Sequence, residues 1–465
     1  MICPKTDRRL DQEEVNITLF GSSRSSLVAM AIFLIATTSA GAQGNAPDTI
    51  RLSLTQARTL AIVQNRDLRA ARLDINIARG NLRQAGVLLP SNPEVDVLRG
   101  APGTEFGLSQ ELEVAGQRGS RKKAASAGVT RASFSVSNVA RTTLGDVDRA
   151  FYRFVAADRR SRLAEEVSVL NQSLADATRR QLQAGEISQL EFNLAIVEGG
   201  RSQGRALGAT RERQETLSNL KLLLGVPVGT TIVAVTDAPF APSDSGAANK
   251  SGSQIPGLAS RSDTAVVHRG NSDSLVATAF RRRPDLLAGV AAIREASAEL
   301  SLARRERFPN LILRASSERV EGKDERQIRP GVGFSVPAFN RNQGEVSARE
   351  AAVRQAELLR DALNARVSAE VSRSLSSYQT AANETRVLEQ TVLVPARENR
   401  RLLEIAYREG KVGLPVLLLI RNQAIDAELE YWEAWLAQHI ALAELDEATG
   451  ETVAMFAPDS VSPPR

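Results

Sequence analysis

The sequence predicts a mostly α-helical fold with a two-fold internal repeat and four β-strands. Helix-spaced apolar residues run through very long stretches, and residues 119–224 contain no proline. Short segments of alternating apolar and polar residues stand between the helical stretches. Glycines typical of helix ends recur at a fixed offset of 225 positions, as in 410 − 185 = 225. The glycine pairs with this offset are Gly119 and Gly344, Gly185 and Gly410, and Gly225 and Gly450.

The composition agrees with long helices packed by small and aliphatic side chains. Aromatic residues make up only 4% of the 465 residues. The net charge of +5 arises from 59 basic and 54 acidic residues that are finely mixed along the chain. Mixed charge of this kind indicates solvated helix faces, so we expect no nucleic-acid partner.

Residues 1–42 have the pattern of a secretory signal peptide. Arg24 precedes an apolar run at residues 27–36, and small residues follow up to Ala42, after which cleavage is expected. The run is shorter than the ~20 residues that a membrane-spanning helix needs. The alternative is a buried helix at the start of a domain. The only cysteine, Cys3, lies within this segment, so we expect the mature chain to form no disulfide.

Residues 43–236 form the first predicted repeat. A helix is expected over residues 52–89, followed by two short strands, the second at 104–114. A very long helix is expected over 124–183, about 90 Å at ~1.5 Å per residue, and a return helix from Ser188 to about 224. Gly185 can end the first of these helices, and Ser188 with Glu191 forms a capping box that begins the second.

A polar linker at residues 237–273 separates this repeat from a second one at 274–450, and residues 451–465 form a C-terminal tail. In the second repeat we expect a helix over 275–307, strands over 310–320 and 329–339, a long helix over 344–407, and a last helix after Gly410. Pro395 removes an amide donor and should kink or split the long helix. Pro415 is tolerated because it falls in the first turn of the last helix.

The four strands alternate as they would if one face met lipid and the other met water. Four strands cannot close a barrel, and an open sheet edge cannot lie in lipid. If the strands cross a membrane, several chains must share one barrel, and three chains would supply twelve strands. A soluble helical bundle capped by a small β-sandwich remains the alternative. The predicted lipid-facing residues are Phe106, Leu108, Leu112, Val332, Phe334 and Val336.

Four stretches carry a resemblance to a known family. They are FGLSQELEVAGQRGSR (106–121), QAGEISQLEFNLA (183–195), GFSVPAFNRNQGE (333–345) and YREGKVGLPVLL (407–418). In this order, with a two-fold repeat, they resemble the TolC-type outer-membrane efflux family. The VAGQRGSR stretch is most similar to the outer component of cobalt-zinc-cadmium exporters.

The resemblance implies a homotrimer with a twelve-stranded β-barrel in the outer membrane and an α-helical barrel in the periplasm. It would be a passive exit duct for a proton-driven inner-membrane pump of the RND class, joined through a periplasmic membrane-fusion adaptor. The two helix breaks would then form the periplasmic tip where the adaptor docks. The expected docking residues are Gly185, Glu186, Ile187, Ser188, Gly410, Lys411, Val412, Gly413 and Leu414.

Relatives often narrow the channel entrance with acidic residues a few positions after the second break, where this chain has Val416 and Leu419. An apolar constriction that closes by dewetting is one interpretation of these candidate gate residues. Burial between helices is the other.

Other functional classes find little support. The chain shows no nucleophile elbow or phosphate loop, so we predict no enzymatic activity and no cofactor. The two histidines, His268 and His439, lie 171 positions apart (439 − 268 = 171), so we expect no zinc site. Tyr431, Trp432 and Trp435 are expected to pack between helices. A soluble periplasmic coiled-coil scaffold or adaptor is the main alternative, and a periplasmic hydrolase with a helical insertion is a weaker one.

Overall fold

A computed structural model describes residues 49–89, 91–100, 103–227, 229–234, 271–319 and 326–451. The predicted signal peptide, residues 237–270 of the predicted linker, and residues 452–465 of the tail lie outside the described residues. So do Cys3 and His268.

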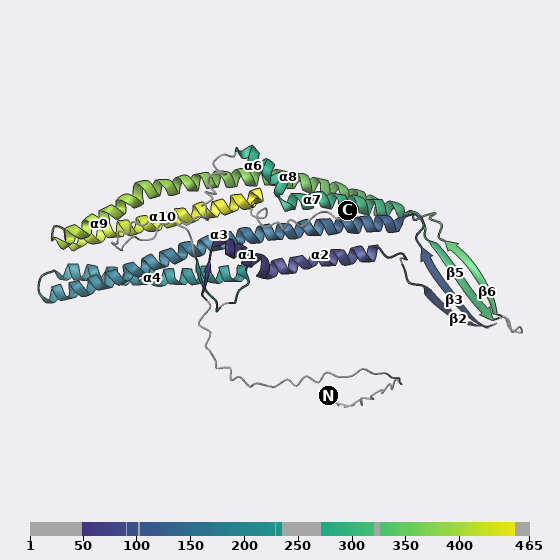
Figure 1. Ribbon diagram of the computed structural model, residues 1–465, viewed down its shortest axis with the longest axis horizontal. Helices are drawn as coiled ribbons and strands as arrows, with labels where there is room; N and C mark the ends of the chain where they lie inside the picture. The colour runs from purple at the N-terminus through teal and green to yellow at the C-terminus, as the bar shows by residue number, and fades with distance from the viewer. Residues whose placement is uncertain are drawn as a thin grey trace, which may run out of the picture. The chain divides into compact units, whose positions relative to one another are not determined.

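The first half of the chain contains two helices, two strands of a sheet, and a long helical hairpin (Figure 1). Its elements are β1 (Thr49–Leu52), α1 (Leu54–Gln64), α2 (Arg66–Ala85), β2 (Glu94–Gly100), β3 (Gly103–Leu112), α3 (Gln117–Gln183), α4 (Gln189–Leu224) and β4 (Thr231–Ala234). The 67 residues of α3 correspond to about 100 Å of unbroken helix at ~1.5 Å per residue.

The second half has a similar succession of elements. These are α6 (Ser272–Arg282), α7 (Pro284–Arg305), β5 (Leu311–Arg319), β6 (Arg326–Phe334), α8 (Gln343–Val387), the π-helix η1 (Leu388–Leu393), α9 (Val394–Arg408) and α10 (Leu414–Thr449). The prediction of a mostly helical fold with long helices and a small antiparallel sheet is therefore confirmed. Among the described residues, no helix combines the length and the hydrophobicity that crossing a membrane requires.

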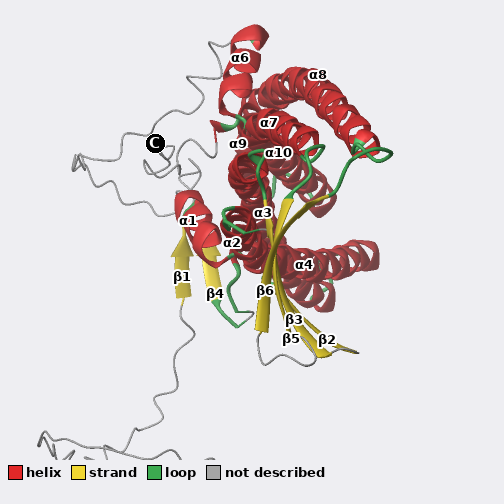
Figure 2. Cartoon of the chain, turned by 90° about the vertical axis from the view of Figure 1, so that its right-hand side faces the viewer, coloured by secondary structure: helices red, strands yellow, loops and turns green. Residues whose placement is uncertain are grey.

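The four-stranded sheet takes two strands from each half, in the order β2-β3-β5-β6, and every neighbouring pair is antiparallel. Figure 2 shows these strands side by side, with β1 and β4 as a separate pair. In the central pair Leu108 lies opposite Ala315, which in turn lies opposite Pro330. The outer strands β2 and β6 each pair on one side only within the described part of the chain.

The register divides the sheet into two chemically different faces, because paired residues share a face and successive residues alternate. One face, called here the apolar sheet face, is exposed along all four strands. Its large exposed side chains are Val95, Val97, Phe106, Leu108, Leu313, Ile328, Val332 and Phe334. The opposite face is mostly polar and includes Glu94, Asp96, Glu105, Ser109 and Arg314. Both faces come from the alternation that the sequence predicts.

The helices next to the sheet form one layer in the order α2-α3-α7-α8, and those toward the hairpin ends follow the order α4-α3-α10-α9. The helix α3 belongs to both layers because of its length. One edge of each layer therefore comes from the first half, as α2 or α4. The other edge comes from the second half, as α8 or α9.

The helix predicted over residues 52–89 is wrong in one respect, because it is divided at Asn65. The Asn65 side chain accepts a hydrogen bond from the Leu68 N–H and so begins α2. It also donates to the Leu223 carbonyl at 2.8 Å. The second half is divided at Arg283, whose guanidinium donates to the Ala448 carbonyl at 3.0 Å.

The prediction that Pro395 kinks or splits the long helix is confirmed as a split, because the π-helix η1 separates α8 from α9 two residues before Pro395. Proline has no N–H to donate to the preceding turn, and π-helical turns are one way to accommodate the lost bond. The Val394 N–H donates to the carbonyl of Glu389, five residues earlier, which is the hydrogen-bond spacing of a π-helix. The first half has an unbroken helix at the corresponding level.

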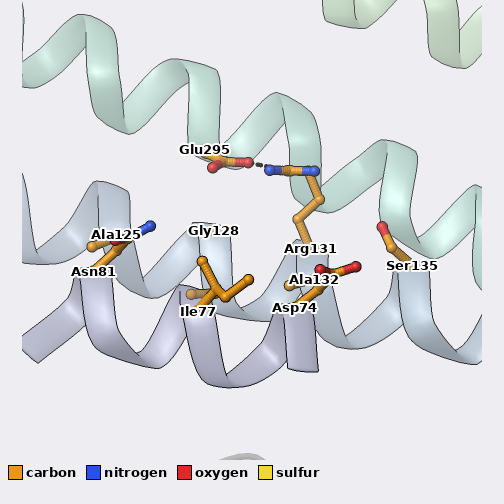
Figure 3. A pocket seen from close by; sticks show the side chains of 10 residues that line it. Asp74, Ile77, Asn81, Ala125, Gly128, Arg131, Ala132, Ser135 and Glu295 are labelled. Atoms are coloured by element: carbon orange, nitrogen blue, oxygen red, sulfur yellow. Dashed lines mark hydrogen bonds and ion pairs between the residues drawn. The ribbon is translucent and has the colours of Figure 1, made fainter. Parts of the chain in front are cut away.

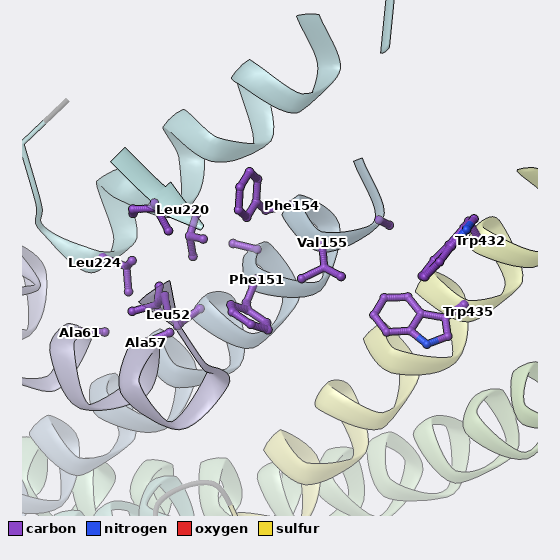
Figure 4. Close-up of a cluster of buried hydrophobic side chains, with 14 of the residues drawn as sticks. Leu52, Ala57, Ala61, Phe151, Phe154, Val155, Leu220, Leu224, Trp432 and Trp435 are labelled. Carbon is purple, nitrogen blue, oxygen red and sulfur yellow. The ribbon is translucent and has the colours of Figure 1, made fainter. Parts of the chain in front are cut away.

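The largest hydrophobic core lies where α1, α3, α4 and α10 meet the short parallel pair β1 and β4 (Figure 4). Leu52 and Ile232 from these strands are buried in it, although sequence analysis missed both strands. Phe151 and Phe154 of α3 fill its centre. Tyr431, Trp432 and Trp435 are also buried in this cluster, which confirms their predicted packing between helices.

A buried ion pair crosses this core. Both guanidinium nitrogens Nε and Nη2 of Arg58 lie 2.7 Å from the carboxylate oxygens of Asp148, which has 0% exposure. Burial raises the pKa of Asp148, even though the Arg58 guanidinium acts in the opposite direction. The pair is geometrically well formed but depends on both partners, because a buried charge is costly once its counter-ion is removed.

We therefore expect Asp148→Ala to lower the free energy of unfolding by about 3–5 kcal/mol, since it removes the bidentate partner of a buried guanidinium. Asp146→Ala is the matched control. Asp146 is exposed and pairs with Arg149 on the same helix, so its loss should cost less than about 1 kcal/mol. Urea titrations of the detergent-extracted protein, followed by helical circular dichroism, measure both values. Equal losses would show that burial does not set the strength of the Arg58–Asp148 pair.

Candidate functional site

The first helical hairpin ends in a turn built by local sequence. Gly185 has φ of 75°, the left-handed conformation that glycine adopts without steric cost. The Gly185 N–H donates to the Leu182 carbonyl at 3.0 Å, and the Glu186 N–H donates to the Gln181 carbonyl at 2.9 Å. These two bonds satisfy carbonyls at the end of α3 in the arrangement of a Schellman motif.

The predicted capping box then begins α4. The Glu191 N–H donates to Ser188 Oγ at 3.3 Å, and the Ser188 N–H donates to Glu191 Oε2 at 2.9 Å. The hydrogen bond from the Ser188 backbone lowers the pKa of Glu191 below its ordinary value. The turn is therefore rigidly specified within about ten residues, although its surface is exposed.

The second hairpin ends in the same way. Gly410 has φ of 73°, its N–H donates to the Tyr407 carbonyl at 3.0 Å, and the Lys411 N–H donates to the Ala406 carbonyl at 2.9 Å. Helix α10 begins at Leu414, with Pro415 in its first turn as predicted. The two turns lie at the same end of the hairpins (Figure 1).

A hydrophobic cluster holds the two hairpins together near these turns. Ala175 and Ala195 of the first hairpin pack with Leu403, Leu414 and Leu417 of the second. A second link lies farther from the turns, where Arg421 Nη1 lies 3.4 Å from Asn171 Oδ1. The ends of both hairpins are thus joined into one surface.

The predicted docking residues differ in accessibility. Leu414 is buried in this cluster, and Ile187 and Val412 are half-buried. The others are exposed: Gly185, Glu186, Ser188, Gly410, Lys411 and Gly413. A partner that reaches this surface would therefore contact the two glycine turns and their polar neighbours. Leu414 is buried in the cluster beneath the surface and would not be accessible to it.

The candidate gate residues Val416 and Leu419 follow on α10. They are 43% and 60% exposed within one chain, while Leu417 and Leu418 between them are buried. The face that carries Val416 and Leu419 is thus not covered within the described part of the chain.

The predicted lipid-facing residues gather on one side of the sheet. Phe106, Leu108 and Leu112 share the apolar sheet face with Val332 and Phe334. The strand predicted over 329–339 is wrong in its limits, because β6 ends at Phe334 and leaves Val336 in the following loop. Alternation continues through residues 332–336, but hydrogen-bonded pairing with β5 stops at Leu311.

A cavity of about 290 Å³ lies between α2, α3 and α7 (Figure 3). Asp74, Ile77 and Asn81 of α2 line one side, and Arg131 forms an ion pair with Glu295 across the other. The charges in this pair neutralise each other, so the cavity offers no convergent set of reactive groups.

The described residues contain no group of three or more metal-ligating side chains. His439, the histidine within the described residues, stacks on Trp435 at 3.9 Å between ring centroids and contacts the Trp435 carbonyl through Nδ1 at 2.8 Å. Burial lowers the pKa of His439 below its ordinary value. These contacts make His439 a packing residue of the helical core.

Long antiparallel hairpins joined to an open sheet with one apolar and one polar face are the arrangement expected of a channel subunit whose barrel is shared between copies. The profile of the family described as "Outer membrane efflux protein" matches residues 275–451. The second repeat of the chain therefore carries the sequence pattern of the outer membrane efflux protein family, whose members are channels of the Gram-negative outer membrane.

Relatives with curated names are distant. The chain is 23% identical to the cobalt-zinc-cadmium resistance protein CzcC of Cupriavidus metallidurans, over 86% of this chain and 90% of that protein. It is 24% identical to the nickel-cobalt-cadmium resistance protein NccC of Alcaligenes xylosoxydans xylosoxydans, over 91% of each chain.

Solved structures share the fold at low sequence identity. A membrane protein from Pseudomonas aeruginosa is similar with a TM-score of 0.64 and 20% identity, over 85% of this chain and 93% of that one. The CmeC outer membrane channel of Campylobacter jejuni is similar with a TM-score of 0.66 and 16% identity, over 85% of each chain.

Proposed function

We propose that three copies of this chain form an export duct through the outer membrane, with the sheets sharing a twelve-stranded β-barrel and the helices forming a tube in the periplasm. The observation that carries the proposal is the four-stranded sheet, which has an exposed apolar face and, within the described residues, two unpaired edges. An unpaired edge cannot lie in lipid. If β2 of one copy pairs with β6 of the next, three sheets close without an edge.

The helices support the same closure. Leu73 and Ile77 are exposed on α2, at the first-half edge of the layer near the sheet. Leu358 and Leu359 are exposed on α8, at the second-half edge of that layer. Head-to-tail contacts between these different surfaces generate a closed ring when the rotation fits. The single rotation that relates neighbouring copies would therefore bury both the strand edges and the apolar helix edges.

The polar sheet face would line the channel. It presents Glu94, Asp96 and Glu105 together with Ser109 and Arg314. Transmembrane barrels that conduct have polar interiors filled with water. The apolar sheet face would then meet lipid, in agreement with the predicted roles of Phe106, Leu108, Leu112, Val332 and Phe334.

The hairpin turns would dock a periplasmic membrane-fusion adaptor, which connects the duct to an inner-membrane pump of the RND class. The support is the glycine turn at the end of both hairpins, which the same pair of backbone hydrogen bonds closes in each half, remote from the sheet along α3. Val416 and Leu419, exposed just beyond the second turn, would line an apolar constriction that closes by dewetting. Burial of these two residues between copies is the competing arrangement.

The cargo we propose is heavy-metal cations, because CzcC and NccC are named for resistance to such metals. The pump and the adaptor would choose the cargo, and this chain would act as a passive pipe.

Membrane fractionation after expression in a Gram-negative host tests the assembly, followed by the native mass of the detergent-extracted protein. We expect the protein in the outer-membrane fraction with the mass of a trimer. A soluble periplasmic monomer would favour the scaffold or adaptor alternative. It would also mean that the alternating segments are ordinary strands of a soluble sheet.

A further inference from the structure

We infer that a basic collar, where the sheet joins the helices, binds the headgroups of anionic phospholipids in the periplasmic leaflet of the outer membrane. The inference rests on the proposed function, which sets the sheet in the membrane. It adds the class of lipid that the chain selects and the side chains that recognise this lipid. The basic collar consists of the four segments that link helices to strands, residues 82–89, 111–123, 304–310 and 336–345.

The basic collar lies at one end of the sheet. Helices α2 and α7 end there, and α3 and α8 begin there, beside the strands (Figure 1). Both halves reach the same level, because Leu112 pairs with Leu311, and Leu311 pairs with Phe334. In the proposed duct this end of the sheet faces the periplasm. The basic collar therefore lies at the height of the headgroups of the periplasmic leaflet.

The net charge of the whole chain is concentrated in the basic collar. Its four segments contain nine basic and four acidic residues, a balance of 9 − 4 = 5 positive charges. The rest of the chain contains 59 − 9 = 50 basic and 54 − 4 = 50 acidic residues, so its charges cancel. Clusters of Lys and Arg at a membrane surface attract anionic lipids. The nine bases are Arg83, Arg118, Arg121, Lys122, Lys123, Arg304, Arg305, Arg307 and Arg341.

Most of these bases have no acidic partner in their own chain. Among the described residues, two of the nine form ion pairs, Arg121 with Glu113 and Arg304 with Glu350. The other seven are exposed. Because their charge is not neutralised within the chain, it remains available to attract an anionic partner, and charge-assisted hydrogen bonds to phosphate are among the strong ones.

Two of the exposed guanidinium groups are held in place by backbone carbonyls. Arg118 Nε donates to the Gly86 carbonyl at 2.9 Å, and Arg305 Nη1 donates to the Ala115 carbonyl at 2.9 Å. Each contact uses one nitrogen of a planar group that has three. A guanidinium offers several N–H donors in a fixed fork that matches phosphate oxygens. Its fixation before binding reduces the entropy that binding costs.

The basic collar also exposes apolar side chains beside its bases. Val87 and Leu88 directly follow the carbonyl that Arg118 contacts, and both are exposed. Phe308 is exposed too, and Phe339 has 95% exposure. Aromatic girdles mark both interfaces of membrane barrels. Bases beside exposed apolar groups suit the boundary between headgroups and acyl chains. This combination favours a phospholipid over a soluble polyanion such as peptidoglycan, which has no acyl chain to cover the apolar groups.

Native mass spectrometry of the detergent-extracted full chain tests this selectivity. The probes are phosphatidylglycerol and phosphatidylcholine with identical acyl chains, so that only the charge and chemistry of the headgroup differ. We expect the trimer to bind phosphatidylglycerol about five times more tightly in dilute ammonium acetate. Raising the salt to about 1 M should remove most of this preference, because the screening length falls to about 3 Å.

A charge-removal variant locates the lipid site. Lys122→Gln, Lys123→Gln and Arg307→Gln together remove three exposed charges that form no ion pair within the described residues. Because these side chains make no contact that supports the fold, the variant should keep the trimer mass. Its preference for phosphatidylglycerol should fall to less than about twofold.

The matched control removes the same number of exposed charges from α4, outside the basic collar. It should keep the full preference for phosphatidylglycerol. Equal losses in the two triple variants would show that total charge sets the preference, and would overturn the inference. The control substitutions are Arg201→Gln, Arg205→Gln and Arg211→Gln.

The outcomes separate this inference from the proposed function. A soluble wild-type monomer would overturn the shared barrel itself. A wild-type trimer that binds both lipids equally would overturn the lipid site and leave the barrel standing. Equal binding of both lipids, together with retention on purified peptidoglycan that only the collar variant loses, would assign the basic collar to the cell wall instead.

Discussion

Deleting residues 183–188 should abolish export while leaving the trimer in the outer membrane. The deletion removes the Gly185 turn and the Ser188 cap, which form the first half of the proposed adaptor surface. The main core around Phe151 and Trp435 and the sheet lie far from it along α3. Assembly should therefore survive, whereas the surface that meets the adaptor is lost.

Three measurements test this deletion in a strain that carries the cognate pump and adaptor. They are growth in cobalt, zinc or cadmium, co-purification with the adaptor, and native mass. Resistance should fall to that of a strain without the channel, and co-purification should be lost. An equal deletion at residues 245–250, within the predicted linker, should preserve both. Normal resistance in the 183–188 deletion would exclude a docking role for this turn.

A charge in the middle of the apolar sheet face should prevent membrane insertion. Leu108 lies near the centre of β3, opposite Ala315, and is exposed. An arginine facing lipid at mid-membrane costs about 2–4 kcal/mol, and a trimer would contain three of them. Leu108→Arg should therefore reduce the protein in the outer membrane to a few per cent of the wild-type amount.

Neighbouring positions supply matched controls for this variant. Ser109→Arg places the same charge on the polar sheet face and should insert normally. Phe334→Arg should insert with only a modest loss, because Phe334 pairs with Leu311 at the helix-proximal end of the sheet. Charge costs fall to about 0–1 kcal/mol near the membrane surface. Quantitative immunoblots of outer-membrane fractions measure all three variants. Similar amounts of the Leu108 and Ser109 variants would show that neither face meets lipid.

The features predicted correctly from sequence are those that a short segment determines by itself. Gly185 and the Ser188–Glu191 capping box specify a turn within a few residues, and the structure shows the same bonds. Alternation around Phe106 and Leu108 likewise predicted which side chains share a face.

The features that were missed depend on residues far apart in the chain. Asn65 ends a helix through a contact with Leu223, which is 158 positions away. The strands β1 and β4 have four residues each and are stable only as a pair on the core around Leu52 and Ile232. A local signal for the break existed, because asparagine is a preferred N-cap residue and the Asn65 side chain caps α2. The end of β6 depends on pairing with β5, which the alternation of residues 329–339 does not reveal.

The contacts at Asn65 and Arg283 follow the two-fold internal repeat of the chain. Both side chains donate to carbonyls at equivalent positions, since 448 − 223 = 225. A neutral amide makes this contact in the first half, and a guanidinium that also binds Asp285 and Glu370 makes it in the second. Six copies of an ancestral half-length chain would supply the same twelve strands as three copies of this one. Fusion of two halves frees each to evolve its own chemistry at positions that a hexamer would keep identical.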